Sequence, residues 1–389
     1  MSVPSWLSTR RSAGFTAAAL ALLAFVPVSL EAQTFQSEEH GFRVVTVAEG
    51  LEHPWSVAFL PNGDLLVTER PGRLRLVRNG VVQPQPIEGV PAVVARGQGG
   101  LLDVVLHPSF AQNQLVYLSY SKPSGSGAVT GVVRGRFDGT RLTDVEEIFE
   151  GSNFSEGGNH FGSRLVFDDE GYLFITVGDR AAPPSLGTGE SHPAQDLSTH
   201  AGTVVRLHDD GRVPDDNPFV GQANAKPEIW SYGHRSLQGL ALDAEGRLWE
   251  SEHGPQGGDE LNLIRPGLNY GWPVIGYGVN YGGAVIHEST EREGMEQPVH
   301  YWVPSIATSG LTIYDGDAFP GWRGNAFLGA LRAQLVSRVI LEDGRAVREE
   351  RLLEGFGERI RDVRTGPDGF IYLLTDSPDG RVLRLEPTS

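Results

Sequence analysis

The chain has 389 residues, a formal net charge of −17 and no cysteine. A protein this acidic is a poor partner for nucleic acid or anionic membranes, and the lack of thiols excludes cysteine nucleophiles and thiolate metal sites. Lys122 and Lys226 are the only lysines, which leaves few candidates for a Schiff base.

The first 32 residues have the pattern of an export signal. Arg10 and Arg11 form a positive segment, the apolar run that follows is short for a bilayer span, and Leu30-Glu31-Ala32 offers a small residue for cleavage. We therefore predict a signal peptide at 1–32 and a periplasmic or secreted mature chain, 33–389, that forms a single domain. A retained membrane anchor is the alternative. No other long apolar run occurs, so no membrane insertion of the mature chain is predicted.

The mature chain is predicted to be all-β. Runs of Val, Leu, Ile, Phe and Tyr alternate with turns rich in Gly and Pro, and no long stretch has a helical period. Pairs of strands recur six times, in chain order 55–59 with 65–68, 101–106 with 115–118, 164–167 with 173–176, the two strands flanking Gly246, 311–314 with 326–328, and 362–364 with 371–375. Their mean spacing of about 61 residues is the length of a four-stranded blade, which predicts a six-bladed β-propeller. An array of sandwiches is the alternative, and the absence of linkers disfavours it.

The two ends of the chain are predicted to meet. Residues 42–47 can pair with 382–385, so that N- and C-terminal strands close the ring and hide both edges. The longer intervals 177–236 and 252–309 carry Pro, Gly and Asn, and we expect them to be loops above one face of the propeller.

In five of the six copies a polar residue stands ten or eleven positions before the turn. These residues are His53, Gln98, His160, Arg235 and Arg359. Because the innermost strand of each blade lines the channel, equivalent positions of the copies converge there. Singly, such residues are more often surface or capping groups. Together, converging cations in an acidic protein predict a bound polyanion held by charge-assisted hydrogen bonds.

The loop 252–260 predicts a metal site. Its Gly and Pro residues expose backbone carbonyls, and Asp259 and Glu260 add carboxylates. Oxygen ligands without cysteine favour Ca²⁺ over Zn²⁺. An acidic turn that holds no metal is the alternative.

Taken together, the motifs resemble the soluble, pyrroloquinoline quinone (PQQ)-dependent glucose and aldose sugar dehydrogenases over about residues 41–387. The resemblance rests on Gly97-Gln98-Gly99-Gly100-Leu101-Leu102, Asn159-His160, Gly233-His234-Arg235, Ser251-Glu252-His253-Gly254-Pro255, Asp259-Glu260-Leu261-Asn262, Asn269-Tyr270-Gly271-Trp272-Pro273 and Arg359-Ile360-Arg361-Asp362-Val363. The segments 305–310 and 361–369 are closer to the aldose sugar branch.

The resemblance implies that an aldose is oxidised at its anomeric carbon to a lactone, with His160 as general base and PQQ over the channel mouth. Electrons would pass to an external acceptor that the sequence does not identify, and the sequence fits a monomer or a homodimer equally. The resemblance implies cofactor- or substrate-side contacts at Gln98, Arg235, Ser236, Tyr281, Arg332, Arg359 and Arg361. It also implies a catalytic Ca²⁺ on the carbonyls of Gly254 and Pro255, and further structural Ca²⁺ at Glu260 and Tyr270.

Four positions depart from the glucose enzymes of this family. Arg332 stands for a lysine, Ser236 for an asparagine, Asn159 for an aspartate and Val303 for a tryptophan. We expect Asn159, Asp259 and Val303 on the substrate side. These changes leave the chemistry intact and predict a sugar range broader than, or different from, glucose.

Two other functions fit the predicted fold. A Ca²⁺-dependent propeller hydrolase, such as a lactonase, also places Ca²⁺ in the channel, but it has no need for Arg235, Arg332, Arg359 and Arg361 together. A propeller that binds a ligand without turnover is the other, because fold does not fix function.

Overall fold

The computed structural model describes residues 1–4, 33–184 and 191–388. Gln33–Ser389 form one compact unit, and Met1–Ala32 form a separate unit. All but the first four residues of the predicted signal peptide therefore lie outside the described residues. No helix in the described part of the chain is long and apolar enough to span a bilayer.

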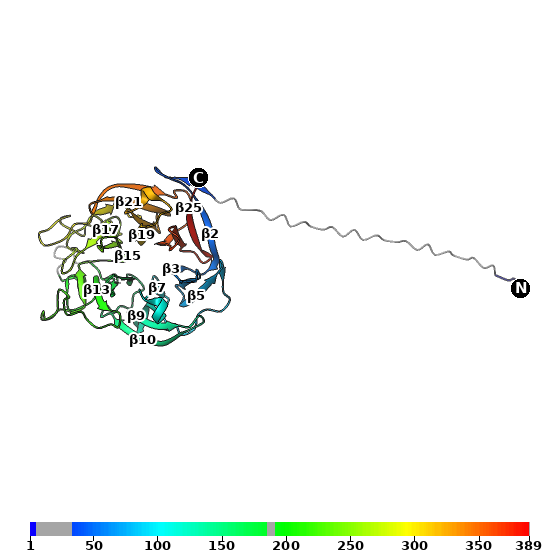
Figure 1. The fold of residues 1–389 in the computed structure, drawn as a ribbon, viewed down its shortest axis with the longest axis horizontal. Helices are drawn as coiled ribbons and strands as arrows, with labels where there is room; N and C mark the ends of the chain where they lie inside the picture. The colour runs from blue at the N-terminus through cyan, green and yellow to red at the C-terminus, as the bar shows by residue number, and fades with distance from the viewer. Residues whose placement is uncertain (5–32, 185–190, 389) are drawn as a thin grey trace. The chain divides into compact units, whose positions relative to one another are not determined.

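Six antiparallel sheets surround a central axis, which confirms the predicted six-bladed β-propeller (Figure 1). We number the blades 1 to 6 in chain order and give their strands from the inside outward. Blade 1 holds β3 (Pro54–Phe59), β4 (Leu65–Glu69), β5 (Arg73–Arg78) and β6 (Val81–Val82); blade 2 holds β7 (Leu101–Leu106), β8 (Leu115–Ser124), β9 (Gly127–Phe137) and β10 (Leu142–Glu150); blade 3 holds β11 (Gly162–Phe167), β12 (Tyr172–Val177), β13 (Thr203–His208) and β14 (Ile229–Tyr232). Blade 4 holds β15 (Leu237–Leu242), β16 (Leu248–Glu252), β17 (Asp259–Ile264) and β18 (His300–Trp302); blade 5 holds β19 (Thr308–Ile313), β20 (Ala326–Ala330), β21 (Leu335–Glu342) and β22 (Arg345–Leu352); blade 6 holds β23 (Ile360–Thr365), β24 (Ile371–Thr375), β25 (Gly380–Pro387), β2 (Gly41–Leu51) and β1 (Thr34–Gln36). The described helices are only single turns, α1 (Phe110–Asn113), η1 (Pro193–Gln195) and η2 (Pro320–Trp322).

The innermost strands β3, β7, β11, β15, β19 and β23 pack against one another around the axis. Each begins within three residues of its predicted start. In blades 1, 3, 4 and 6 the turn that follows is tight because its glycine adopts a positive φ, for example 86° at Gly63 and 73° at Gly246. The repeat seen in the sequence is therefore the repeat of the blades.

Blade 6 is built from both ends of the chain, as predicted. Strand β2 pairs antiparallel with β25, with Val44 opposite Leu385 and Thr46 opposite Leu383. This pairing closes the ring and leaves no open edge between the first and last strands.

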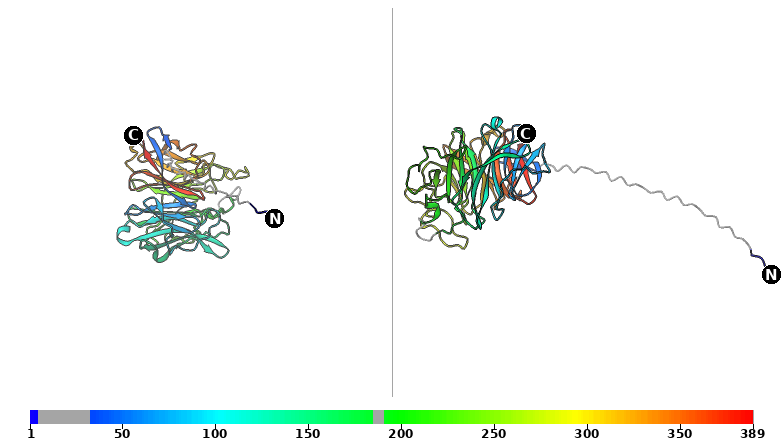
Figure 2. Two further views of the ribbon diagram at one scale, coloured as in Figure 1. Left: turned by 90° about the vertical axis from the view of Figure 1, so that its right-hand side faces the viewer. Right: turned by 90° about the horizontal axis from the view of Figure 1, so that it is seen from below.

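The two long intervals differ from the expectation that they are loops throughout. They also contain the outer strands β13 and β14 of blade 3 and β17 and β18 of blade 4. These strands are short and lie among segments rich in turn residues, so the sequence pattern did not predict them. The remaining connections, coloured green to yellow in Figure 2, extend beyond the ends of the sheets.

Apolar side chains fill the spaces between neighbouring blades. Phe42 of β2 is fully buried in a cluster with Phe319, Trp322 and Phe327 of blade 5, and its ring centroid lies 5.6 Å from that of Trp322. Ring closure thus adds packing as well as hydrogen bonds.

Phe42→Ala should lower the free energy of unfolding by about 3–5 kcal/mol, because it opens a cavity beneath the closing strand. Urea unfolding measures the loss. Thr46→Ala, on the same strand but exposed, should change the free energy of unfolding by less than about 0.5 kcal/mol. Similar losses in both variants would contradict the docking of β2.

Candidate active site

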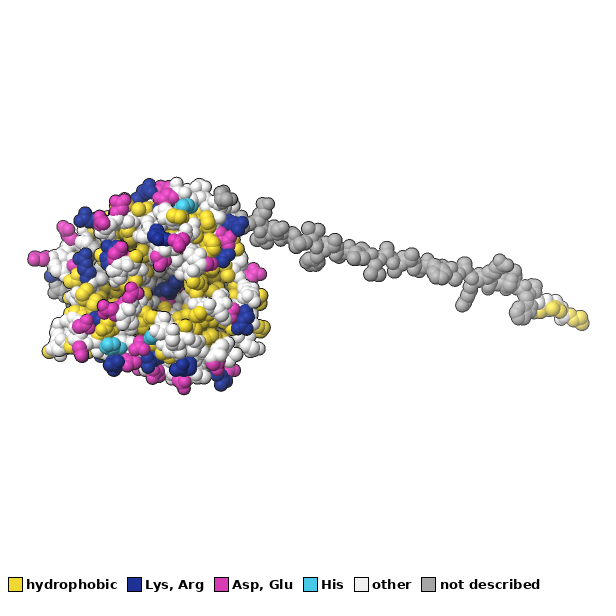
Figure 3. Space-filling view, in the orientation of Figure 1, with side chains coloured by type: hydrophobic (Ala, Val, Ile, Leu, Met, Phe, Trp, Pro, Cys, Tyr) yellow, Lys and Arg dark blue, Asp and Glu magenta, His cyan; other side chains and the backbone are white. Residues whose placement is uncertain are grey.

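A cavity of about 310 Å³ lies where segments leading into the innermost strands meet. Its size is at the lower end of the roughly 300–1,000 Å³ of small-molecule sites. Six of the predicted site residues line it, namely Gln98, Asn159, His160, Arg235, Pro255 and Tyr281. The propeller brings them together because Gln98, His160 and Arg235 each stand just before an innermost strand. Figure 3 shows basic side chains within a hollow at the centre of the ring.

His160 is held on both its backbone and its ring. Its φ of 51° is uncommon for a residue with a side chain, and its backbone N–H donates to Gln98 Oε1 at 2.8 Å. Its Nδ1 lies 2.6 Å from Asp179 Oδ1. With that carboxylate as acceptor, the proton resides on Nδ1 and Nε2 keeps its lone pair. This arrangement of carboxylate and imidazole can act as a base.

Asp179 is held in turn by two more donors. Trp272 Nε1 donates to Oδ2 at 2.9 Å, and the backbone N–H of Ala181 donates to Oδ1 at 2.8 Å. Burial alone raises the pKa of Asp179, but the His160 imidazole and then Arg235 outweigh it, so that the pKa lies below its usual value. Asp179 is therefore an anion that fixes the ring of His160.

Arg235 lines the large cavity and also contacts the loop 252–260. One of its guanidinium nitrogens donates to the carbonyls of His253 and Gly254, both at 2.9 Å. The guanidinium carbon lies 5.1 Å from the centre of the Trp272 ring. A Cβ on Gly254 would lie 2.2 Å from the carbonyl oxygen of Gly257, so only glycine fits there.

A second, smaller cavity of about 20 Å³ lies beside this loop. It is lined by all four predicted metal-binding residues, Gly254, Pro255, Glu260 and Tyr270, and also by Glu252. Its volume suits one water molecule or ion. Carbonyl and carboxylate oxygens are the ligands that Ca²⁺ prefers, so the residues present fit this ion.

Two further predicted arginines gather around Asp376. Arg359 Nη2 lies 3.0 Å and Arg361 Nη2 3.3 Å from Asp376 Oδ2, and His53 Nδ1 lies 3.0 Å from Oδ1. Burial raises the pKa of Asp376, but Arg361, His53 and Arg359 together hold it well below the usual value. Arg359 also donates to the carbonyl of Leu331 at 3.1 Å, next to Arg332, whose own side chain is exposed.

His253 is a buried imidazole close to both Arg235 and Arg361. Burial lowers its pKa to about 3, with further lowering from Arg235, His160 and Arg361. Its Nε2 lies 2.5 Å from the carbonyl oxygen of Thr308. One neutral imidazole thus lies within electrostatic range of the base, of Arg235 and of Arg361. Arg361 Nη1 also donates to Gln238 Oε1 at 3.2 Å, and Gln238 lies three residues after Arg235. Arg235, Arg361 and the carbonyls of His253 and Gly254 therefore lie in one region of the propeller.

Three of the predicted residues, Asp259, Val303 and Ser236, line neither cavity and are not part of the arginine group near Asp376. Asp259 is fully buried, and it accepts hydrogen bonds from the backbone of Gly254 at 2.9 Å and from that of Ala307 at 2.7 Å. Its carboxylate shapes the loop, so it is not on the substrate side as expected. Val303 is 58% exposed beside Gly257, at the rim, and Ser236 is buried next to Gln238.

The sequence analysis missed Asp179 and Asp376. Both stand within two residues of the end of the second strand of their blades, β12 and β24, and each pairs with the polar residue that precedes the first strand. A carboxylate at this equivalent position is a signal that the repeat alignment contained. Trp272 lay within a quoted motif but carried no assigned role.

Comparisons with known proteins agree with this geometry. The family model for glucose/sorbosone dehydrogenases matches residues 51–384. The aldose sugar dehydrogenase YliI of Escherichia coli is 46% identical over 351 residues, covering 88% of this chain and 92% of the relative. The solved apo-form of the soluble aldose sugar dehydrogenase of E. coli has a TM-score of 0.85 at 44% identity, over 89% of this chain and 100% of that one. The solved PQQ-bound form of the aldose sugar dehydrogenase of Streptomyces coelicolor has a TM-score of 0.73 at 31% identity, over 89% of this chain and 98% of that one. The chain therefore belongs to the glucose/sorbosone dehydrogenase family, which confirms both the resemblance carried by its motifs and its assignment as an oxidoreductase.

Proposed function

We propose that the protein oxidises an aldose at its anomeric carbon, using PQQ and Ca²⁺, and passes the electrons to an external acceptor. The observation that carries this proposal is the hydrogen-bonded pair of His160 and Asp179 at a cavity shared with Gln98 and Arg235. A relative of known structure that binds PQQ supports the choice of cofactor.

When bound near Arg235, Arg359 and Arg361, PQQ would supply the hydride acceptor, and Ca²⁺ near Gly254 and Pro255 would supply a Lewis acid. His160 Nε2 takes the proton of the anomeric hydroxyl, and the C–O bond becomes the carbonyl of a lactone. The imidazolium that forms is stabilised by Asp179, whose anionic carboxylate lies 2.6 Å from Nδ1.

The basic side chains suit an acceptor that carries three carboxylates. Arg235 lines the cavity, and Asp376 holds Arg359 and Arg361 in fixed positions. Guanidinium groups bind carboxylates in two-pronged geometry and stay charged at any physiological pH. Arg332 is exposed beside this group and adds a further charge.

The catalytic Ca²⁺ would be held by the carbonyls of Gly254 and Pro255, and structural Ca²⁺ by Glu260 and Tyr270; all four residues line the small cavity. We further propose that residues 1–32 are an export signal and that the domain 33–389 works in the periplasm or outside the cell. The positive segment and short apolar run of the first 32 residues support export.

Addition of PQQ to the purified protein should shift the absorbance spectrum of the quinone, and Ca²⁺ should tighten binding. The holoprotein should then reduce an electron-accepting dye when aldoses are added. No dye reduction with any of a panel of mono- and disaccharides would sink the proposal. Hydrolysis of lactones without PQQ would favour the hydrolase instead.

His160→Ala should lower kcat by about two to four orders of magnitude, because no other base would take the hydroxyl proton. The same absorbance titration should show that PQQ still binds. His208→Ala, on β13 at the opposite end of blade 3, serves as the matched control and should keep full activity. An unchanged rate in His160→Ala would exclude the role.

Asp179→Asn should lower kcat by about two to four orders of magnitude, because an amide favours the wrong tautomer of His160. The double variant with His160→Ala should be no slower than His160→Ala alone, since the two residues act as a unit. Additive losses in turnover would show that Asp179 acts independently of His160.

A further inference from the structure

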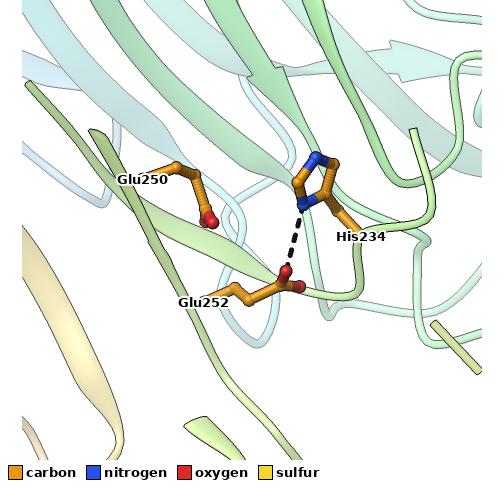
Figure 4. Close-up of side chains that lie close together, drawn as sticks. All are labelled: His234, Glu250 and Glu252. Atoms are coloured by element: carbon orange, nitrogen blue, oxygen red, sulfur yellow. Dashed lines mark hydrogen bonds and ion pairs between the residues drawn. The ribbon is translucent and has the colours of Figure 1, made fainter. Parts of the chain in front are cut away.

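Blade 4 contains a group of buried acids that the proposed reaction does not use. Glu250 and Glu252 are alternate residues of β16 and project from the same face of the sheet, while His234 lies in the segment before β15. Figure 4 shows the two carboxylates and the imidazole turned toward a common point. One ligand atom of each residue lies within 4.8 Å of the other two, and all three residues are buried. The three ligand atoms are close enough together to hold one metal ion.

The charge of this group is not balanced by basic side chains. Several other buried carboxylates pair with arginine, as Glu69 does with Arg73 at 2.6 Å and Asp103 with Arg364 at 2.8 Å. Across residues 33–184 and 191–388, no arginine or lysine forms an ion pair with Glu250 or Glu252. Two buried carboxylates without a cation are costly unless a positive charge lies between them.

Hydrogen bonds do not replace the missing cation. The side-chain amide of Asn262 lies 3.3 Å from Glu250, Glu252 and Glu260 alike, but its nitrogen has only two hydrogens to donate. Glu250 Oε1 and Asn262 Oδ1 are both buried and have no hydrogen-bond partner. Buried oxygens left unpaired in this way are rare and indicate a missing partner.

His234 has the surroundings of a metal ligand. Its Nδ1 faces Glu252 Oε1 at 3.0 Å, and its Nε2 lies 3.0 Å from Ser231 Oγ. A ligating histidine characteristically hydrogen-bonds through its other ring nitrogen, which fixes the ring. The ring also stacks on Tyr270 with centroids 4.6 Å apart.

We propose that a divalent cation binds between His234, Glu250 and Glu252, with the side-chain amide of Asn262 beside it. An imidazole with two carboxylates suits Zn²⁺ or Mn²⁺ better than Ca²⁺ or Mg²⁺. The site is separate from the small cavity near Gly254, which neither His234 nor Glu250 lines, although Glu252 lies between the two.

A cation here would also steady the neighbouring active-site segment. Glu252 Oε2 accepts a hydrogen bond from the backbone N–H of Arg235 at 2.5 Å, and Glu252 directly precedes His253-Gly254-Pro255. Fixing this carboxylate fixes the backbone on which Arg235 is carried. The role is structural and does not depend on the proposed reaction.

The test compares metal content in the wild type and in Glu250→Gln, which keeps the shape but removes the charge. Each full-length protein is stripped with a chelator, dialysed separately against Zn²⁺, Mn²⁺ or Ca²⁺, and analysed for bound metal. The wild type should hold one more Zn²⁺ or Mn²⁺ per chain than Glu250→Gln, with equal Ca²⁺. Glu245→Gln, in the exposed turn of the same blade, is the matched control and should bind as the wild type does.

Thermal unfolding provides a second measurement. Zn²⁺ or Mn²⁺ at one hundred times Kd should raise the Tm of the metal-free wild type by roughly 5 °C. The rise should be largely lost in Glu250→Gln and, as a second variant, in His234→Gln.

The alternative is that Glu250 is a neutral acid, since burial and then the Glu252 carboxylate raise its pKa well above the usual value. In that case Glu250→Gln would bind as much Zn²⁺ and Mn²⁺ as the wild type, and the metal would raise Tm equally in both. That result, or a Glu250-dependent site that takes Ca²⁺ alone, would overturn the proposal.

Discussion

The pairing of β2 with β25 is the constraint on which the remaining structure depends. Six blades bring their innermost strands to one axis only if the ring is closed, and the closing blade takes strands from both ends of the chain. Closure then sets the distances between residues that are far apart in sequence. His160 and Arg361, about two hundred positions apart, thus lie close enough to act on the same buried imidazole.

Buried charge is organised in the same way in several blades. A residue before the first strand meets a carboxylate just after the second, as His160 meets Asp179 and Arg359 meets Asp376. The pairing lowers the pKa of each carboxylate in spite of burial, because a hydrogen-bond donor or a nearby positive charge favours the charged form. The active site is therefore a set of fixed charges held by the blades, with few parts that must move to assemble it.

Blade 4 departs from this pattern. Its buried glutamates have an amide and an imidazole for neighbours, and no arginine among the described residues pairs with them. The loop that follows places carbonyls and carboxylates around a space the size of one ion. Where the other blades use arginine to balance acids, this blade is built in a way that suits bound cations.

The sequence by itself determined the fold, the start of each innermost strand to within three residues and six of the residues that line the large cavity. The fold could be predicted because the repeat is local: a strand, a tight turn and a second strand can be recognised within about twenty residues. The site could be predicted because polar residues at equivalent positions of the copies must converge in a closed ring. Short outer strands such as β18 were not predicted, because three residues are too few to show the alternating pattern of a strand. Three features were decided only by the tertiary structure. Asp259 supports the loop of Gly254, and Asp179 and Asp376 orient His160 and the arginines Arg359 and Arg361. Glu250 is buried without a countercharge in the described part of the chain. Burial and pairing are properties of contacts between distant segments, and no local pattern records them.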